Sequence, residues 1–168
     1  ATGSIGDSTL KVIRKHPDKI QLIGISAHQQ TEKLFTIAKE FQVPLACLTN
    51  SPKDQVTPPP HTQLHTGQNS LEELAALDEA DIVVVAIVGA AGLLPTLSAL
   101  RAGKDVVLAN KESLVVGGEI VIETAKKYGA RIIPADSEHN AVFQCIQGQE
   151  HKTIQSIILT ASGGPFRE

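Results

Sequence analysis

The run Ile82-Val83-Val84-Val85-Ala86-Ile87-Val88 decides the fold class of this sequence. A continuous β-branched stretch of this length is typical of a parallel strand that is buried on both faces of a sheet. A glycine-bearing turn follows it, and apolar periodicity then predicts a helix over residues 93–102 that ends at Gly103. A strand followed by a crossover helix indicates an α/β fold.

The same alternation continues outward from this run in both directions. Further strands are expected over residues 20–27, 45–48, 105–109, 131–133 and 154–160, and further helices over residues 7–15, 31–41, 70–77 and 119–128. Residues 49–67 are polar and Pro-rich, so we expect an exposed excursion there. Alternation at this spacing requires right-handed crossovers, which predicts a Rossmann-like, doubly wound, mostly parallel sheet with helices on both faces.

Composition and charge argue against several classes of protein. The 168 residues are 42% hydrophobic and 20% charged, with a formal net charge of −3. A nucleic-acid binder needs a basic footprint, so we expect no nucleic-acid partner. No apolar run approaches the ~18 residues that span a bilayer, and no secretory signal is visible, so we expect no membrane partner. Two cysteines, Cys47 and Cys145, are too few for a disulfide framework, and we expect a reduced, cytoplasmic setting.

Ligands bind at the carboxyl ends of the strands in such sheets, so the turns at that edge are the candidate sites. Gly3-Ser4-Ile5-Gly6 begins the first expected helix, where free N–H groups and the helix dipole suit a phosphate. The complete dinucleotide fingerprint has a further glycine and a strand before it, which these 168 residues do not contain. A plain turn is the alternative explanation.

The residues after the strand expected at 20–27 bear on the choice between NAD and NADP. A carboxylate there would bind the adenine ribose hydroxyls, but the sequence has His28-Gln29-Gln30. The absence of an acid leaves room for the additional phosphate of NADP, with His28 and Lys33 as the nearest cations. A solvated polar loop explains these residues equally well.

Asn110-Lys111-Glu112-Ser113 follows the strand expected at 105–109, at the same edge. Asparagine can hydrogen-bond an amide or a sugar, and lysine can hold a phosphate or an anionic oxygen. An adjacent lysine and glutamate also form solvated surface pairs that contribute little. The position of this string at the ligand-binding edge favours a functional role.

Asp136-Ser137-Glu138-His139-Asn140 is the densest cluster of reactive side chains. In an extended segment Asp136 and Glu138 point to the same side, where Mg²⁺ or Mn²⁺ would offset their repulsion. His139 admits zinc as a rival, although no second histidine is near it in the sequence. A helix N-terminus capped by Asp136 or Ser137 is the alternative. Farther on, Ser162-Gly163-Gly164 indicates either an anion-binding turn or a loop that reverses the chain.

Together these strings resemble one family, the 1-deoxy-D-xylulose 5-phosphate reductoisomerases. The resemblance covers essentially the whole chain and rests on ATGSIG at residues 1–6, GAAGLLPT at 89–96, ANKESLV at 109–115, DSEHNA at 136–141 and SGGPFR at 162–167. It implies a Rossmann-like NADPH-binding domain over residues 1–133, without its first strand, and the truncated start of an α+β catalytic domain over residues 134–168. It also implies a homodimer in the complete enzyme and an inactive fragment here.

The resemblance implies a role for each matching residue. Cofactor contacts are implied for Thr2, Gly3, Ser4, Ile5, His28, Gln29, Gln30, Asn110 and Glu112. Metal ligation is implied for Asp136 and Glu138, catalysis for Lys111, Asp136 and Glu138, and substrate binding for Lys111, Ser137, Glu138 and Ser162. Family members often carry a basic triplet where this chain has His28-Gln29-Gln30, so we expect a weaker preference for NADPH over NADH.

The implied reaction converts 1-deoxy-D-xylulose 5-phosphate into 2-C-methyl-D-erythritol 4-phosphate in the non-mevalonate isoprenoid pathway. Mg²⁺ or Mn²⁺ would chelate oxygens of the sugar phosphate while its carbon skeleton rearranges, and NADPH would reduce the resulting aldehyde. Two alternatives stay open. One is a metal-independent Rossmann oxidoreductase that uses NAD(P), and the other is a nucleotide-binding fragment without activity.

Overall fold

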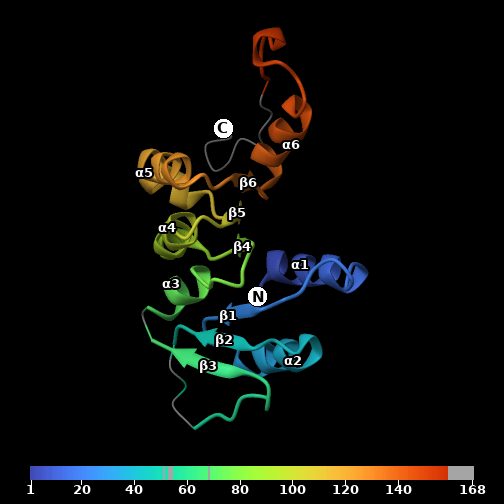
Figure 1. Cartoon of the computed structure of the whole chain (residues 1–168), viewed down its shortest axis with the longest axis vertical. Helices are drawn as coiled ribbons and strands as arrows, with labels where there is room; N and C mark the ends of the chain where they lie inside the picture. The colour runs from blue at the N-terminus through green and yellow to red at the C-terminus, as the bar shows by residue number, and fades with distance from the viewer. Residues whose placement is uncertain (51, 53–54, 68, 159–168) are drawn as a thin grey trace, which may run out of the picture.

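The computed structural model describes residues 1–50, 52, 55–67 and 69–158 (Figure 1). Its elements in chain order are α1 (Ser4–Lys15), β1 (Gly24–Ala27), α2 (Thr31–Phe41), β2 (Leu45–Leu48), β3 (Gln63–Thr66), α3 (Ser70–Ala75), β4 (Ile82–Val85), the 3₁₀ turn η1 (Gly89–Gly92), α4 (Leu93–Arg101), β5 (Asp105–Leu108), α5 (Glu112–Tyr128), β6 (Ile132–Pro134), α6 (Ser137–Ile146) and the 3₁₀ turn η2 (His151–Thr153). The predicted alternation of strands and helices is confirmed.

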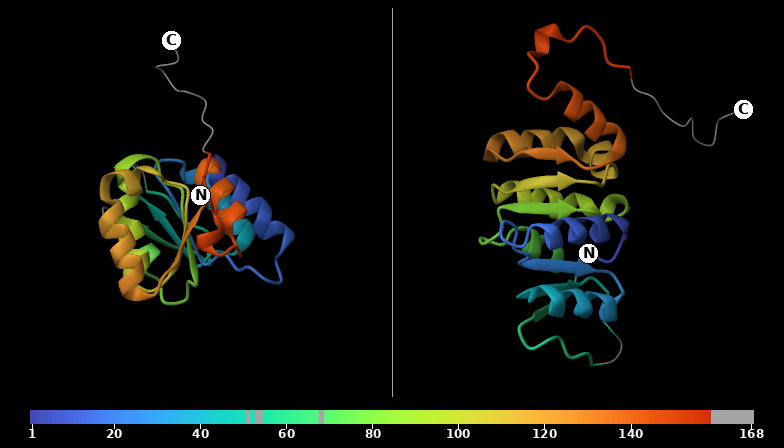
Figure 2. Two further views of the ribbon diagram at one scale, coloured as in Figure 1. Left: turned by 90° about the horizontal axis from the view of Figure 1, so that it is seen from above. Right: turned by 90° about the vertical axis from the view of Figure 1, so that its right-hand side faces the viewer.

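The described strands form two parallel sheets of three strands each, in the orders β1-β2-β3 and β4-β5-β6. Ile25 pairs with Ala46 in the first sheet, and Val84 pairs with Val107 in the second. Figures 1 and 2 show the two sheets following one another along the long axis of the molecule, with β1 and β4 as the neighbouring strands. No backbone pairing among the described residues joins β1 to β4. The fold is therefore the predicted parallel α/β class, with its strands divided between two sheets.

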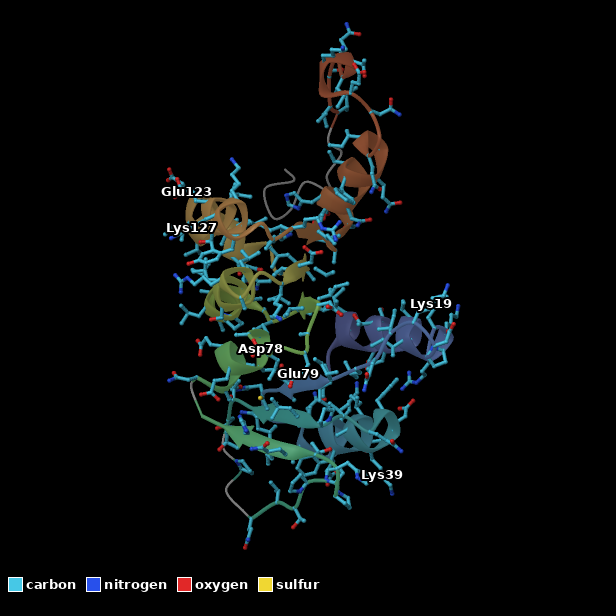
Figure 3. All side chains as sticks on the ribbon, in the orientation of Figure 1. Lys19, Lys39, Asp78, Glu79, Glu123 and Lys127 are labelled. Carbon is cyan, nitrogen blue, oxygen red and sulfur yellow. The ribbon has the colours of Figure 1, made fainter. Side chains whose placement is uncertain are left out.

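Helices lie on both sides of these strands. Figure 2 shows α3, α4 and α5 on one side and α1 and α2 on the other. One buried core joins α1 and α2 to the first sheet through Leu10, Leu34 and Leu48. A second core joins α4 and α5 to the other sheet through residues such as Leu100 and Val106. Charged side chains project outward from the helix layers, among them Lys39 of α2 and Glu123 and Lys127 of α5 (Figure 3).

The expectation that the run at residues 82–88 is buried on both faces is wrong. The strand ends at Val85, and the side chains of Ile82 and Val84 are 56% and 39% exposed. Val85 is buried because it faces the helix-covered side, in the core with Leu100 and Val106. Alternate residues of a strand face opposite sides, so Ile82 and Val84 lie on the side where α4 and α5 do not pack.

Three further segments differ from the sequence-based expectation. Gln63–Thr66 lies within the expected excursion but forms the edge strand β3, because its backbone pairs in register with β2. The helix expected over residues 119–128 begins earlier, at Glu112, and bends at Gly117, whose φ of −135° is not helical. Of the strand expected over residues 154–160, residues 154–158 have no regular secondary structure, and 159 and 160 lie outside the described residues.

Among the residues that the structure describes, no helix combines the length and the apolar character that a membrane span requires.

Candidate functional site

The N-terminal loop lies beside the carboxyl end of β1. The Ala1 nitrogen donates a hydrogen bond to the Ser26 carbonyl oxygen near the end of that strand. Gly3 is the N-cap of α1, and no side chain caps the first turn of the helix. A Cβ on Gly6 would lie 2.9 Å from the Ala1 Cα, so only glycine permits this close approach of the loop to the helix. Uncapped N–H groups at a helix start form an anion cradle, and the predicted phosphate-binding residues 2–5 are placed in it.

Lys33 of α2 ties this loop to the neighbouring helix. Its ammonium donates to the Thr2 carbonyl oxygen at 3.0 Å and lies 3.0 Å from the Asp7 carboxylate. Asp7 belongs to the first turn of α1. The sequence singles out Lys33 only as a nearby cation, because its partners Thr2 and Asp7 lie far from it in the sequence, in the N-terminal loop and in α1.

The residues predicted to contact the adenosine end of a cofactor follow β1. His28 Nδ1 lies 2.7 Å from the Thr49 hydroxyl oxygen. Gln29 and Gln30 line an open hollow of about 430 Å³, whose other walls come from Thr31, Glu32 and Lys33. The hollow carries one acidic and one basic side chain. These charges belong to Glu32 and Lys33.

Asn110 is the most thoroughly bonded of the predicted site residues, and it is only 2% exposed. Its amide nitrogen donates to the carbonyl oxygens of Ile87 and Gly89. Its amide oxygen accepts from the backbone N–H of Ser113 at 2.8 Å and from the Ser113 hydroxyl. These bonds use every donor and acceptor position of an asparagine side chain. The side chain therefore fastens the turn after β4 to the start of α5.

Gly92 is part of the same arrangement. A Cβ on Gly92 would lie 2.9 Å from the Asn110 Cγ, so the turn η1 passes directly over the asparagine amide. The sequence alone does not predict this set of Asn110 hydrogen bonds, the Asn110 bracket, which joins the turn after β4 to the start of α5. The signal that could have indicated it is the pair of glycines in GAAG, because glycine permits close backbone approach.

Lys111 and Glu138 come from different strand ends and lie within electrostatic range of each other. Lys111 is the exposed N-cap of α5, and Glu112 follows it in the first helical turn. The Ser137 hydroxyl donates to Glu138 at 2.9 Å and lowers the pKa of that carboxyl, and the charge of Lys111 lowers it further. The structure thus brings together three of the residues predicted to act on the substrate.

Asp136 is the N-cap of helix α6, so the extended geometry considered for residues 136–138 does not continue past Asp136. Its carboxylate accepts the backbone N–H of His139 at 3.0 Å, and His139 Nδ1 lies 2.6 Å from the same oxygen. Burial raises the pKa of Asp136, but the hydrogen bonds from His139 outweigh that effect and hold the pKa below its usual value. The helix-start alternative describes the local structure, because the cap satisfies an N–H group that the first turn leaves without a partner.

The donors at this position fit a hard divalent cation in part. Asp136 and Glu138 both have lowered pKa values, so both offer ionised oxygens at neutral pH. Within the described residues, no three His, Cys, Asp or Glu side chains converge on one point. Mg²⁺ commonly takes one or two protein carboxylates and completes its shell with water and substrate oxygens, so the pair is sufficient as a partial ligand set.

A cavity of about 580 Å³ adjoins the start of α6. Ser137 and Glu138 are among its lining residues, together with apolar side chains such as Val142, Ile146 and Ile154. Two residues predicted to bind substrate therefore face a space of suitable size for a small ligand. Ser162, the remaining residue predicted to bind substrate, lies outside the described residues.

Comparison with known proteins gives consistent matches over the chain. A family model described as 1-deoxy-D-xylulose 5-phosphate reductoisomerase matches residues 1–118, and a model of the C-terminal domain of that enzyme matches residues 132–168. The 1-deoxy-D-xylulose 5-phosphate reductoisomerase of Clostridium acetobutylicum is 47% identical over 99% of this chain.

Two solved structures are also similar to this chain. The enzyme of Zymomonas mobilis in complex with NADPH gives a TM-score of 0.87 at 38% identity over 99% of this chain. A DOX-P reductoisomerase in complex with magnesium gives a TM-score of 0.85 at 42% identity over 98% of this chain. The chain spans 45% of the length of each of these three relatives.

Proposed function

The chain belongs to the 1-deoxy-D-xylulose 5-phosphate reductoisomerase family, and from this we propose that it is the N-terminal part of a full-length enzyme of that kind. The observation that carries the proposal is the match of two consecutive family models to nearly the whole chain. The proposed reaction is the NADPH-dependent and metal-dependent conversion of 1-deoxy-D-xylulose 5-phosphate into 2-C-methyl-D-erythritol 4-phosphate, a step of the non-mevalonate isoprenoid pathway.

The proposed domain division places residues 1–133 in the NADPH-binding domain and residues 134–168 at the start of the catalytic domain. The end of β6 at Pro134 and the start of the second family match at residue 132 support a boundary there. The adjacent free edges of β1 and β4 support a further strand of the full-length protein between them (Figure 1). That strand would join the two sheets into one doubly wound sheet.

The proposed NADPH site follows the carboxyl edge of the strands. The N–H groups at the start of α1 hold the pyrophosphate, and the hollow beside Gln29 and Gln30 accepts the adenosine end. Bound NADPH supplies the hydride for the reduction. The Asn110 bracket holds the turn after β4 against the start of α5, so that Lys111 and Glu112 keep a fixed position at this edge.

The proposed metal and substrate site lies at the start of α6. Asp136 and Glu138 hold Mg²⁺ or Mn²⁺, which supplies Lewis acidity toward the carbonyl and hydroxyl oxygens of the ketose phosphate. Lys111 offers a positive charge to an anionic substrate oxygen, and the Ser137 hydroxyl offers a hydrogen bond to the same ligand. In this proposal Glu138 binds the metal and also contacts the substrate.

The proposed complete enzyme is a cytoplasmic homodimer. Cys47 is buried, Cys145 is exposed and both are free, which fits a reducing compartment.

The test is turnover by the full-length protein, followed through the absorbance of NADPH. Oxidation of NADPH should require both 1-deoxy-D-xylulose 5-phosphate and a divalent cation, stop on addition of a chelator, and resume when excess Mg²⁺ is added. The isolated 168-residue chain should give no turnover. Reduction of the substrate by the full-length protein without a metal would contradict the proposal and favour a metal-independent oxidoreductase.

A further inference from the structure

Two ion pairs join α1 to α2, one at each end of the pair of helices. Lys33 and Asp7 meet at the end that carries the N-terminal loop, with 3.0 Å between the ammonium and the carboxylate. Arg14 and Glu40 meet at the other end, with 2.5 Å between the guanidinium and the carboxylate. All four side chains are between 41% and 47% exposed. By exposure alone the two pairs should stabilise the fold by similar, small amounts.

Of these two ion pairs, only the one with Lys33 includes a further hydrogen bond to the backbone. The Lys33 ammonium accepts no hydrogen bonds and has three N–H donors, of which one is directed at the Thr2 carbonyl oxygen at 3.0 Å. The Thr2–Gly3 peptide is trans, so its C=O and N–H point in opposite directions. Fixing the Thr2 carbonyl toward Lys33 therefore fixes the Gly3 N–H toward the opposite side of the peptide. The orientation of the first donor of the anion cradle depends on this contact.

The second partner of Lys33 has an electrostatic consequence. Asp7 is an acid in the first turn of α1, where its negative charge repels any phosphate bound at the helix start. The Lys33 ammonium offsets that charge at 3.0 Å. One side chain thus orients the cradle and offsets the charge of the nearest acid in its first turn.

We propose that Lys33 is a positioning residue for the cofactor-phosphate loop and acts through its contacts with Thr2 and Asp7; this inference rests on the proposed NADPH site. Its effect falls on the pyrophosphate, which NADPH and NADH share. A direct ligand of the 2′-phosphate would instead affect NADPH alone. The comparison of the two dinucleotides therefore separates a positioning role from a specificity role.

The experiment measures the affinity of the full-length protein for NADPH and for NADH by the fluorescence of the nicotinamide, together with steady-state kinetics. Three variants are compared with the wild type. Lys33→Met removes both contacts, and Lys33→Arg retains a cation of similar reach. Lys39→Met is the matched control, because Lys39 is an exposed cation on the outer side of the same helix (Figure 3).

The expected result is a loss of affinity of about fivefold for both dinucleotides in Lys33→Met, which corresponds to the upper range for an exposed ion pair. The value of kcat at saturating NADPH should stay unchanged, because uniform binding is lost and transition-state binding is not. Lys33→Arg should retain most of the affinity, and Lys39→Met all of it.

Three results would overturn the inference while leaving the proposed function intact. Unchanged affinity in Lys33→Met would show that the contacts do not matter for the loop. A loss confined to NADPH would make Lys33 a ligand of the 2′-phosphate. An equal loss in Lys39→Met would indicate a general charge effect. A wild-type protein that binds neither dinucleotide would instead overturn the proposed function and this inference together.

Discussion

Replacement of Asn110 by alanine separates two roles for this side chain, as a structural bracket or as a cofactor ligand. The substitution removes the donors to Ile87 and Gly89 and the acceptor for Ser113. Ser113 is fully buried, so water cannot replace the acceptor that its N–H and hydroxyl lose. The carbonyls of Ile87 and Gly89 belong to half-buried residues, where water can replace the lost donor.

The structure sets the size of the expected effect. A loss of about 1 kcal/mol for each bond to Ser113, and of less for each bond that water can replace, amounts to about 3 kcal/mol of unfolding free energy. The assay is urea unfolding of the cofactor-free, full-length protein, followed by far-UV circular dichroism. Asn110→Asp is the companion variant, because it keeps the acceptor for Ser113 but places one carboxylate oxygen, in place of the donor nitrogen, against the carbonyl oxygens of Ile87 and Gly89. It should be destabilised as well.

A loss below about 1 kcal/mol in cofactor-free Asn110→Ala would refute this reasoning, because each buried bond alone accounts for that much. A sharp fall in NADPH affinity without that loss of stability would instead make Asn110 a side-chain ligand of the cofactor.

Three further substitutions test other parts of the account. Gln29→Lys places a cation in the hollow after β1 and should raise the NADPH/NADH ratio of kcat/KM by roughly fivefold. An unchanged ratio would show that the adenosine end of the cofactor does not bind in this hollow. Glu138→Gln should raise the Mg²⁺ concentration needed for half-maximal activity by at least roughly tenfold without weakening NADPH binding; the same metal dependence as wild type would leave Glu138 as a helix-start residue only. Hydrogen bonds from the Arg131 side chain and backbone hold the pKa of Asp105 below its usual value of about 3.9. These bonds therefore stabilise the folded protein at pH values above about 3.9, and the stabilisation is lost as the pH falls through the folded-state pKa of Asp105. The thermal midpoint of Asp105→Asn should therefore lie below that of wild type at neutral pH and approach it below about pH 4; a constant gap measured by calorimetry would contradict that assignment.

The extent of agreement between sequence and structure depends on whether an element is specified locally. The sequence predicts β2 to the residue and α2 to within one residue at its start, because a short apolar strand and apolar residues at helical spacing are local signals. It misses β3, whose polar residues form a strand only because β2 lies beside them. It also misses the first turns of α5, because Gly117 and Gly118 have poor helix propensity. Gly117 packs against Leu93, since a Cβ there would lie 3.0 Å from a methyl group of that side chain, and this contact is not visible in the local sequence.

The candidate site likewise has features that the sequence predicts and features that depend on tertiary contacts. The neighbourhood of Lys111 and Glu138 follows from the rule that parallel strands direct their carboxyl ends to one edge. The saturation of the Asn110 amide could not be predicted, since two of its partners belong to the turn after another strand. The sequence does offer Asp136 as a helix cap, as one of two alternatives, because aspartate before a helical segment is a common N-cap.

The most direct measurement of the central claim is a crystal structure of the full-length protein with NADPH and Mn²⁺, with the manganese located by its anomalous scattering. The account predicts the pyrophosphate against the N–H groups of residues 2–5, with no NADPH atom bonded to the Asn110 amide. It predicts the manganese on carboxylate oxygens of Asp136 and Glu138. A pyrophosphate away from the start of α1, or a manganese ion that touches neither carboxylate, would contradict it.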